Sequence, residues 1–148
     1  MENEDVLYVS EHRGSYSNKD ELPDFVSDDL DFILFPISIT RFEAQKAKIE
    51  LEKQGYKIGI ANIVWIKPFA MKKEWEKATI SSKFGGIVLD DDYSQGVATN
   101  LAYEIMKKTG KKIDVMGLKN KSAGFSKETD NLPPNCYEIV KKVKQIIK

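Results

Sequence analysis

Residues 58–69 read IGIANIVWIKPF, an apolar run that stops at a lysine-proline pair. Near-continuous apolar character is typical of a strand buried on both faces, as in a parallel sheet covered by helices. Proline has no amide hydrogen and disfavours helix in the residue before it, so Pro68 is expected to close the strand and redirect the chain. We therefore expect a strand at about residues 57–65.

Similar runs lie on both sides of this stretch and alternate with helical patterns. Strands are predicted at residues 31–37 (DFILFPI), 85–89 (GGIVL) and 112–118 (KIDVMGL), and helices at about residues 40–54, 71–82, 95–109 and 135–148. Strands that alternate with helices of this length favour a parallel sheet with right-handed crossovers. The expected fold is α/β, a three-layer αβα arrangement with a mostly parallel sheet and helices on both faces.

Two kinds of residue mark the predicted helix ends. Thr40 is a plausible N-cap because Glu43 follows at the capping-box spacing, and Gly55 and Gly110 are suited to terminate helices.

The N-terminal part has a different character. Residues 5–10 (DVLYVS) form a short strand-like run, and the polar, charged stretch after it contains Gly14 and Pro23. Such composition is typical of a loop or linker. We therefore divide the chain into a connecting segment, residues 1–30, and a domain, residues 31–148.

Composition excludes several classes of function. The 148 residues include 23 Lys plus Arg and 23 Asp plus Glu, so no overall basic field favours nucleic acid or an anionic membrane. The single cysteine cannot form an internal disulfide, and with one histidine it cannot build a thiolate and imidazole zinc site. No stretch has the length of a signal peptide core or a spanning helix. We expect a cytoplasmic protein with one core.

A candidate ligand site lies where the third predicted strand ends, at Asp90, Asp91 and Asp92. Open α/β sheets bind ligands at the carboxyl ends of their strands, so these carboxylates, with Ser38 and Thr40 after the first strand, are candidates to hold a small ligand or Mg²⁺. The alternative is a solvated turn that caps the helix beginning near Ser94. General preference for Asp at helix starts favours the turn.

Other candidate chemistry is weak. Gly96 opens a helix but follows three aspartates, and no GxGxxG or Walker pattern occurs, which disfavours phosphate binding. His12 stands in the linker without a second histidine. Cys136 lies in the first turn of the last helix, where the dipole could lower its pKa, yet no histidine is near it in sequence to act as a base. We assign no catalytic, cofactor-binding or metal residue to this chain.

The order of these signals resembles the C-terminal domain of the transketolase family, which includes the beta subunits of 2-oxoacid dehydrogenases such as pyruvate dehydrogenase. The resemblance covers residues 31–147. Ser38 and Thr40 follow the first strand as in the family, and residues 62–69 match a pattern like Asp-Leu-Arg-x-Leu-x-Pro-Phe. Two further matches lie closer to the C-terminus. A Glu-Glu pair before a glycine-rich helix start is matched by Asp90, Asp91, Tyr93 and Gly96, and a Leu-Pro-x-x-x-x-Ile-Val pattern is matched by Leu132, Pro133, Ile139 and Val140.

The connecting segment also resembles this family. Residues 9–16 (VSEHRGSY) look like the Glu-His-Arg-x-x-Tyr segment at which the preceding pyrimidine-binding domain of dehydrogenase beta subunits ends. The sequence departs from the family at three places. Val64 replaces the usual arginine, Ala70 replaces the usual aspartate, and Gln95 with Gly96 replaces a double glycine. These changes would remove polar contacts at the family's surface, whereas its core pattern is kept.

The resemblance implies a part of a thiamine-diphosphate enzyme that is not catalytic alone. Thiamine diphosphate and Mg²⁺ would be bound in the parent enzyme by other domains or subunits, and this chain, a fragment or split subunit, would support dimerisation, homo-oligomer formation and partner docking. The candidate interface residues are Trp65, Phe69 and Trp75. The alternative function is a stand-alone regulatory module that binds a small ligand or metal, and an independent enzyme has the least support because no catalytic dyad can be assembled.

Overall fold

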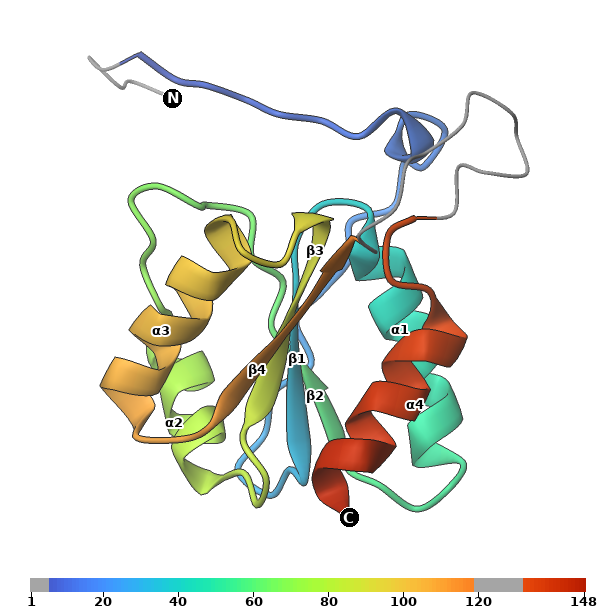
Figure 1. Cartoon of the computed structure of the whole chain (residues 1–148), viewed down its shortest axis with the longest axis vertical. Helices are drawn as coiled ribbons and strands as arrows, with labels where there is room; N and C mark the ends of the chain where they lie inside the picture. The colour runs from blue at the N-terminus through green and yellow to red at the C-terminus, as the bar shows by residue number, and fades with distance from the viewer. Residues whose placement is uncertain (1–5, 119–131) are drawn as a thin grey trace.

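The computed structural model describes residues 6–118 and 132–148 and shows three layers (Figure 1). After a short 3-10 turn, η1 (Arg13–Ser15), strands and helices alternate. They are β1 (Phe32–Pro36), α1 (Thr40–Glu52), β2 (Ile58–Ile60), α2 (Lys73–Ser81), β3 (Gly86–Tyr93), α3 (Val97–Thr109), β4 (Ile113–Leu118) and α4 (Cys136–Ile147).

The four strands form one sheet in the order β2-β1-β3-β4, and every neighbouring pair is parallel. Phe32 lies opposite Ile58 on one side of β1, and Ile33 lies opposite Gly86 on the other. Because all strands run the same way, their carboxyl ends meet at one edge of the sheet. The predicted α/β fold with helices on both faces is confirmed.

Side chains that alternate along the strands pack into two separate hydrophobic clusters, one on each face of the sheet. Phe32 and Leu34 pack with α1 and α4 on one face, whereas Ile33 and Phe35 pack with α2 and α3 on the other. Figure 1 shows the sheet nearly edge-on between these two helical layers. Strand β1 is fully buried, as its apolar sequence predicts.

The second strand is shorter than predicted. It ends at Ile60, and beyond it a single isolated bridge joins Ile63 to Ile37. The ladder stops because Pro36 has no amide with which to continue the pairing. The Asn62 amide faces the outer edge of β2 and donates to the Asp24 carboxylate at 2.8 Å. The peptide bond between Lys67 and Pro68 is cis.

The described part of the strand-like run, residues 6–10, forms no strand, and its residues are exposed. In contrast, the segment just before β1 packs on the domain. Phe25 makes an antiparallel bridge with Ile60 at the outer edge of β2, and Leu30 is buried in the core. Apolar residues alone did not form a strand at the N-terminus because no adjacent strand offers them hydrogen bonds there.

The observed helix ends agree in part with the ends that the sequence predicts. Gly110 has a φ of 66° and its amide donates to the Met106 carbonyl, so it terminates α3 as expected. Asn135 and Glu138 form a full capping box at the start of α4. Thr40, however, is not an N-cap. Ile39 occupies that position without a side-chain cap, and the Thr40 hydroxyl serves another purpose described below.

Gly85 and Gly55 provide a test of close packing at the amino ends of the strands. Both have positive φ, but a Cβ added at Gly85 would lie 2.0 Å from the Lys112 carbonyl oxygen, whereas one at Gly55 would meet nothing within 4 Å. We expect Gly85→Ala to lower the free energy of unfolding by about 3 kcal/mol or more, and Gly55→Ala by only about 1 kcal/mol. Urea unfolding of both variants measures the difference, and equal losses would contradict the packing.

Candidate functional site

A cleft of about 490 Å³ opens at the carboxyl edge of the sheet. This volume lies within the range typical of small-molecule sites. The cleft is bounded by the ends of β1 and β3, by the chain after β2, and by residues 10–12, which precede η1. Its lining residues are Ser10, Glu11, His12, Ile37, Ser38, Arg41, Ile63, Val64, Ile66, Asp90, Asp91, Asp92 and Val97.

The three aspartates belong to β3 itself, because the strand continues to Tyr93 instead of ending at Leu89. Leu89 lies opposite Met116 and Tyr93 lies opposite Leu118, so four steps along β3 match two along β4. Such an irregularity bends a strand and redirects its side chains. The predicted solvated turn capping a helix near Ser94 is therefore wrong: α3 begins at Val97, and its N-cap, Gly96, has no side-chain cap.

Asp90 is the most unusual of the three. Only 4% of its surface is exposed, and its Oδ1 accepts a hydrogen bond from the Asp92 amide at 3.2 Å. Burial disfavours the charged form and the neighbouring Asp91 adds negative charge, and together they raise the pKa of Asp90 to about 6. A carboxyl with this pKa changes charge between mildly acidic and neutral pH.

Ser38 and Asp91 meet across the cleft, as the parallel arrangement of their strands requires. The Ser38 hydroxyl donates to Asp91 Oδ2 at 2.7 Å. Ser38 has a φ of 52°, a left-handed conformation that costs of order 1 kcal/mol for a residue other than glycine. This hydrogen bond helps to hold the chain in that turn between β1 and α1.

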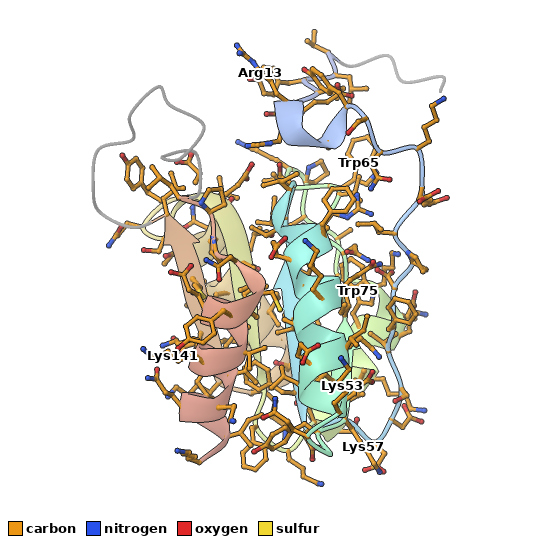
Figure 2. The ribbon with its side chains drawn as sticks, turned by 90° about the vertical axis from the view of Figure 1, so that its right-hand side faces the viewer. Arg13, Lys53, Lys57, Trp65, Trp75 and Lys141 are labelled. Carbon is orange, nitrogen blue, oxygen red and sulfur yellow. The ribbon has the colours of Figure 1, made fainter. Side chains whose placement is uncertain are left out.

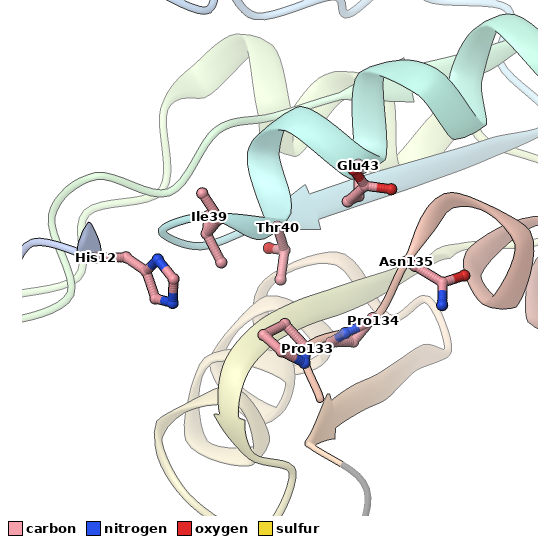
Figure 3. Close-up of a pocket in the computed structure, with 7 residues that line it drawn as sticks. All are labelled: His12, Ile39, Thr40, Glu43, Pro133, Pro134 and Asn135. Atoms are coloured by element: carbon pink, nitrogen blue, oxygen red, sulfur yellow. The ribbon is translucent and has the colours of Figure 1, made fainter. Parts of the chain in front are cut away.

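Thr40 is not part of this cleft. It is fully buried, its hydroxyl donates to the Ile37 carbonyl at 2.6 Å, and the Leu89 carbonyl lies 3.1 Å away. The side chain thus ties the ends of β1 and β3 together. Thr40 also lines a separate cavity of about 300 Å³ between the starts of α1 and α4 (Figure 3).

Arg41 was missed by the sequence analysis, although its place one residue after Thr40 puts it at the same edge. Its Nε donates to Asn62 Oδ1 and its guanidinium also donates to the Leu22 carbonyl, both at 3.2 Å. Burial lowers the pKa of Arg41, which the nearby Asp24 partly offsets. The guanidinium therefore mainly anchors the connecting segment.

The three candidate interface residues differ in exposure. Trp65 is 49% exposed near the carboxyl edge (Figure 2), Phe69 is half-buried against the core, and Trp75 is only 3% exposed. The indole of Trp75 donates to Asp24 Oδ2 at 3.0 Å. A side chain this buried offers almost no surface to a partner, so the prediction of Trp75 as an interface residue is wrong for the chain by itself. Val64 and Ile66, which flank Trp65, are also exposed.

The remaining candidates show no reactive arrangement. Burial, with the negative charge of Glu43, raises the pKa of the Cys136 thiol, which opposes activation by the helix dipole. His12 accepts a hydrogen bond from the Gly14 amide through Nδ1. In residues 6–118 and 132–148, no three His, Cys, Asp or Glu side chains are grouped to hold a metal ion. Among the helices of the same ranges, none has both the length and the apolar character needed to cross a bilayer.

Comparisons with known proteins place the fold but not the activity. No protein-family model matches the sequence, and no curated protein matches it. The structure resembles a chain of a split-gene transketolase, an inactive beta4 tetramer, with a TM-score of 0.61 and 14% identity over 79% of this chain and 38% of that one. It also resembles a chain of 2-oxoglutarate:ferredoxin oxidoreductase from Magnetococcus marinus, solved with 2-oxoglutarate, coenzyme A and succinyl-CoA, with a TM-score of 0.62 and 18% identity over 91% of this chain and 21% of that one.

These likenesses define the class of fold. The chain has the α/β fold found in transketolase-related domains, and it spans well under half the length of either chain it resembles. Identities this low show the fold alone, since one fold supports many activities.

Asp90 generates a pH-dependent prediction. Its pKa is raised from 3.8 to about 6, so the folded state holds this proton more tightly than the unfolded state. Its contribution to stability is full below about pH 4 and is lost as the pH rises through 6, a loss of roughly 1–3 kcal/mol. We expect Asp90→Asn to abolish this decline when urea unfolding is measured from pH 4 to 7.

The control is Asp92→Asn, because Asp92 is exposed on the same strand. Asp31 acts in the opposite direction at lower pH: hydrogen bonds from the Lys57 amide and from Lys83 lower its pKa, so its contribution is lost only below about pH 4. Identical pH profiles for Asp90→Asn and the unmodified protein between pH 4 and 7 would contradict the assignment.

Proposed function

We propose that this chain is the C-terminal domain component of a thiamine-diphosphate enzyme of the transketolase or 2-oxoacid dehydrogenase class, present as a fragment or a split subunit. It serves dimerisation and docking of partner chains instead of catalysis. The observation that carries the proposal is the extent of the fold match: 79% and 91% of this chain align with only 38% and 21% of two much longer chains. A chain of this size corresponds to one component of such an assembly.

The cofactor does not fit the residues present. A diphosphate carries several negative charges, and the cleft at the carboxyl edge presents Asp90, Asp91 and Asp92 to it. The described part of the chain also has no group of three ligands for Mg²⁺. Within this proposal, thiamine diphosphate and Mg²⁺ belong to partner domains or subunits, and we derive no catalytic step in this chain.

Docking of partners is supported by the exposed apolar residues after β2. Val64, Trp65 and Ile66 are consecutive in the sequence and are 66%, 49% and 40% exposed. Consecutive exposed apolar side chains that include a tryptophan are typical of interface centres. The split-gene transketolase forms a beta4 tetramer, which supports the expectation that this chain also forms a homo-oligomer within its parent enzyme.

The decisive experiment is affinity capture of the tagged chain from its native lysate. We expect a chain with thiamine-diphosphate-binding domains to copurify, with the cofactor detected by the fluorescence of its oxidised thiochrome form. The recovered complex should turn over a keto acid or sugar phosphate, whereas the chain alone should not. Turnover by the purified chain alone, or capture without any cofactor-binding partner, would contradict the proposal.

Trp65 provides a test of the docking surface. We expect Trp65→Ala to weaken association with the captured partner by about tenfold or more, because truncation of a central interface tryptophan typically costs at least 2 kcal/mol. The midpoint of thermal unfolding of the isolated chain should change little, since Trp65 is half-exposed.

The matched control is Tyr137→Ala, which removes an aromatic side chain that is 75% exposed on α4. Both affinities are measured by surface plasmon resonance. Equal affinities for the two variants would show that the surface at Trp65 is not the docking surface.

A further inference from the structure

Residues 6–9, which read VLYV, are an exposed apolar segment before η1. Each of the four side chains is at least 46% exposed, and Tyr8 is 88% exposed. No backbone hydrogen bond between described residues involves them, and Figure 1 shows this part of the chain running clear of the helices and strands. Four consecutive exposed apolar side chains are uncommon on a soluble protein unless they serve binding.

The composition of this N-terminal apolar segment suits a strand. Valine and tyrosine favour strands, and an apolar residue at every position is typical of a strand covered on both faces. In an extended chain, Val6 and Tyr8 point to one face, and Leu7 and Val9 point to the other. The segment therefore matches a sheet edge that offers free backbone groups together with apolar side chains on both faces.

The two outer edges of the sheet differ in this respect. At the edge of β2, the amides of Phe25 and Ile60 each donate to the carbonyl of the other at 2.7 Å, so the chain before β1 covers that edge. At the opposite edge, no strand or bridge of the described residues lies beyond β4.

The backbone of β4 has groups that face away from the sheet. The Lys112 carbonyl accepts a hydrogen bond from the Gly86 amide at 3.2 Å, so it faces β3. Backbone groups alternate in direction along a strand, and those of Ile113 and Val115 therefore face outward. An unpaired strand edge of this kind is a template for another strand.

The side chains of β4 also suit an added strand. All residues of β4 after Ile113 are only partly buried, whereas every residue of β1 is buried. Val115 packs partly against the cluster on the α3 face, and Met116 packs partly against the cluster on the α4 face. The strand contains neither lysine nor proline, two residues that commonly keep an edge from pairing.

Charge indicates the direction in which the two segments pair. In the sequence, Glu4 and Asp5 come directly before the N-terminal apolar segment, and Lys111 and Lys112 come directly before β4. Parallel pairing brings these oppositely charged residues side by side, whereas antiparallel pairing sets them at opposite ends. Every neighbouring pair in the sheet is also parallel.

We propose that the N-terminal apolar segment of one copy of this chain adds to β4 of a second copy as a fifth parallel strand. Tyr8 lies beside Val115 and Val9 lies beside Met116. The two copies exchange their segments reciprocally, which closes the assembly at two chains. The pairing does not depend on the proposed function, because it uses neither the surface at Trp65 nor a thiamine-diphosphate-binding partner.

The first test is sedimentation velocity of the full chain at low salt, pH 7.5, from about 10 μM to about 1 mM, the range that reveals weak association. We expect a monomer–dimer equilibrium. Tyr8→Pro removes an amide from the added strand and should raise the dimer dissociation constant at least tenfold. The control is Lys19→Pro, at an exposed position of the connecting segment outside residues 6–9, and it should stay within about twofold.

A monomer at every concentration would overturn the proposal. That result would also cover a chain whose own segment pairs with its own β4, and one whose edge is reserved for a different protein. Equal dissociation constants for Tyr8→Pro and Lys19→Pro would overturn it as well.

The parallel direction is tested by reversing one charge. Lys112→Glu should weaken the dimer about fivefold or more, and 0.5 M NaCl should weaken the unmodified dimer, because both reduce attraction to the acidic residues before the segment. Lys73→Glu makes the same change of net charge at an exposed position on α2 and should stay within about twofold. Equal effects of the two substitutions would contradict parallel pairing.

The edge itself is located with a peptide, so that β4 need not be altered. The capped peptide acetyl-EDVLYVSE-amide is titrated into ¹⁵N-labelled Tyr8→Pro, whose own segment is disabled. We expect saturable shifts of the Ile113 and Val115 amides, and none with the matched peptide acetyl-EDVLPVSE-amide. Saturable shifts confined to residues 64–66, or no saturation, would overturn the assignment to β4. These outcomes are independent of whether a cofactor-binding partner is captured from a lysate.

Discussion

Strand β1 lies in the middle of the sheet and is buried on both faces, and the positions of the other elements follow from that burial. Its alternate side chains enter two different clusters, Phe32 and Leu34 on one face and Ile33 and Phe35 on the other. A strand with no exposed face requires a layer of helices on each side. The crossovers that supply these helices make the strands parallel, which brings all their carboxyl ends to one edge.

The end of β1 determines the shape of that edge. Pro36 lacks an amide, so the ladder to β2 lapses there, and the chain turns through Ser38 in a left-handed conformation. Strand β3 does not stop at the same level but continues to Tyr93. The cleft exists because one central strand ends early while its neighbour carries three aspartates beyond it. The hydroxyl of Thr40, between the Ile37 and Leu89 carbonyls, fixes the spacing of these two strands.

Sequence patterns predicted the elements better than they predicted their ends. The strands β1 to β4 and the helices α1 to α4, which make up the described part of the domain, were expected, because buried apolar runs and helical periodicity are properties of local sequence. The length of β2, the extension of β3 through Asp90 and the absence of a strand at residues 6–10 depend on which neighbours supply hydrogen bonds, and no local pattern records this. Ser38, Asp90 and Asp91 were placed together correctly, since parallel strands share an edge. Arg41 and the hydrogen bond from the Trp75 indole were missed because their partners, Leu22 and Asp24, lie in a segment that looked like a linker.

The buried and half-buried aspartates differ in whether the fold stabilises or disfavours their charged form. Asp24 accepts hydrogen bonds from Lys72, Asn62 and Trp75, and Asp31 accepts them from Lys57 and Lys83, so both fasten the connecting segment and the start of β1 to the domain. Burial alone would raise the pKa of Asp24, but these bonds lower it overall, as expected where a fold stabilises the ionised form. At Asp90 the balance is reversed and the fold disfavours the charge. Among the described residues, the ion pairs of Asp24 and Asp31 thus hold the chain before β1 against the domain, whereas Asp90, Asp91 and Asp92 take part in no ion pair at the edge at which α/β sheets bind their ligands.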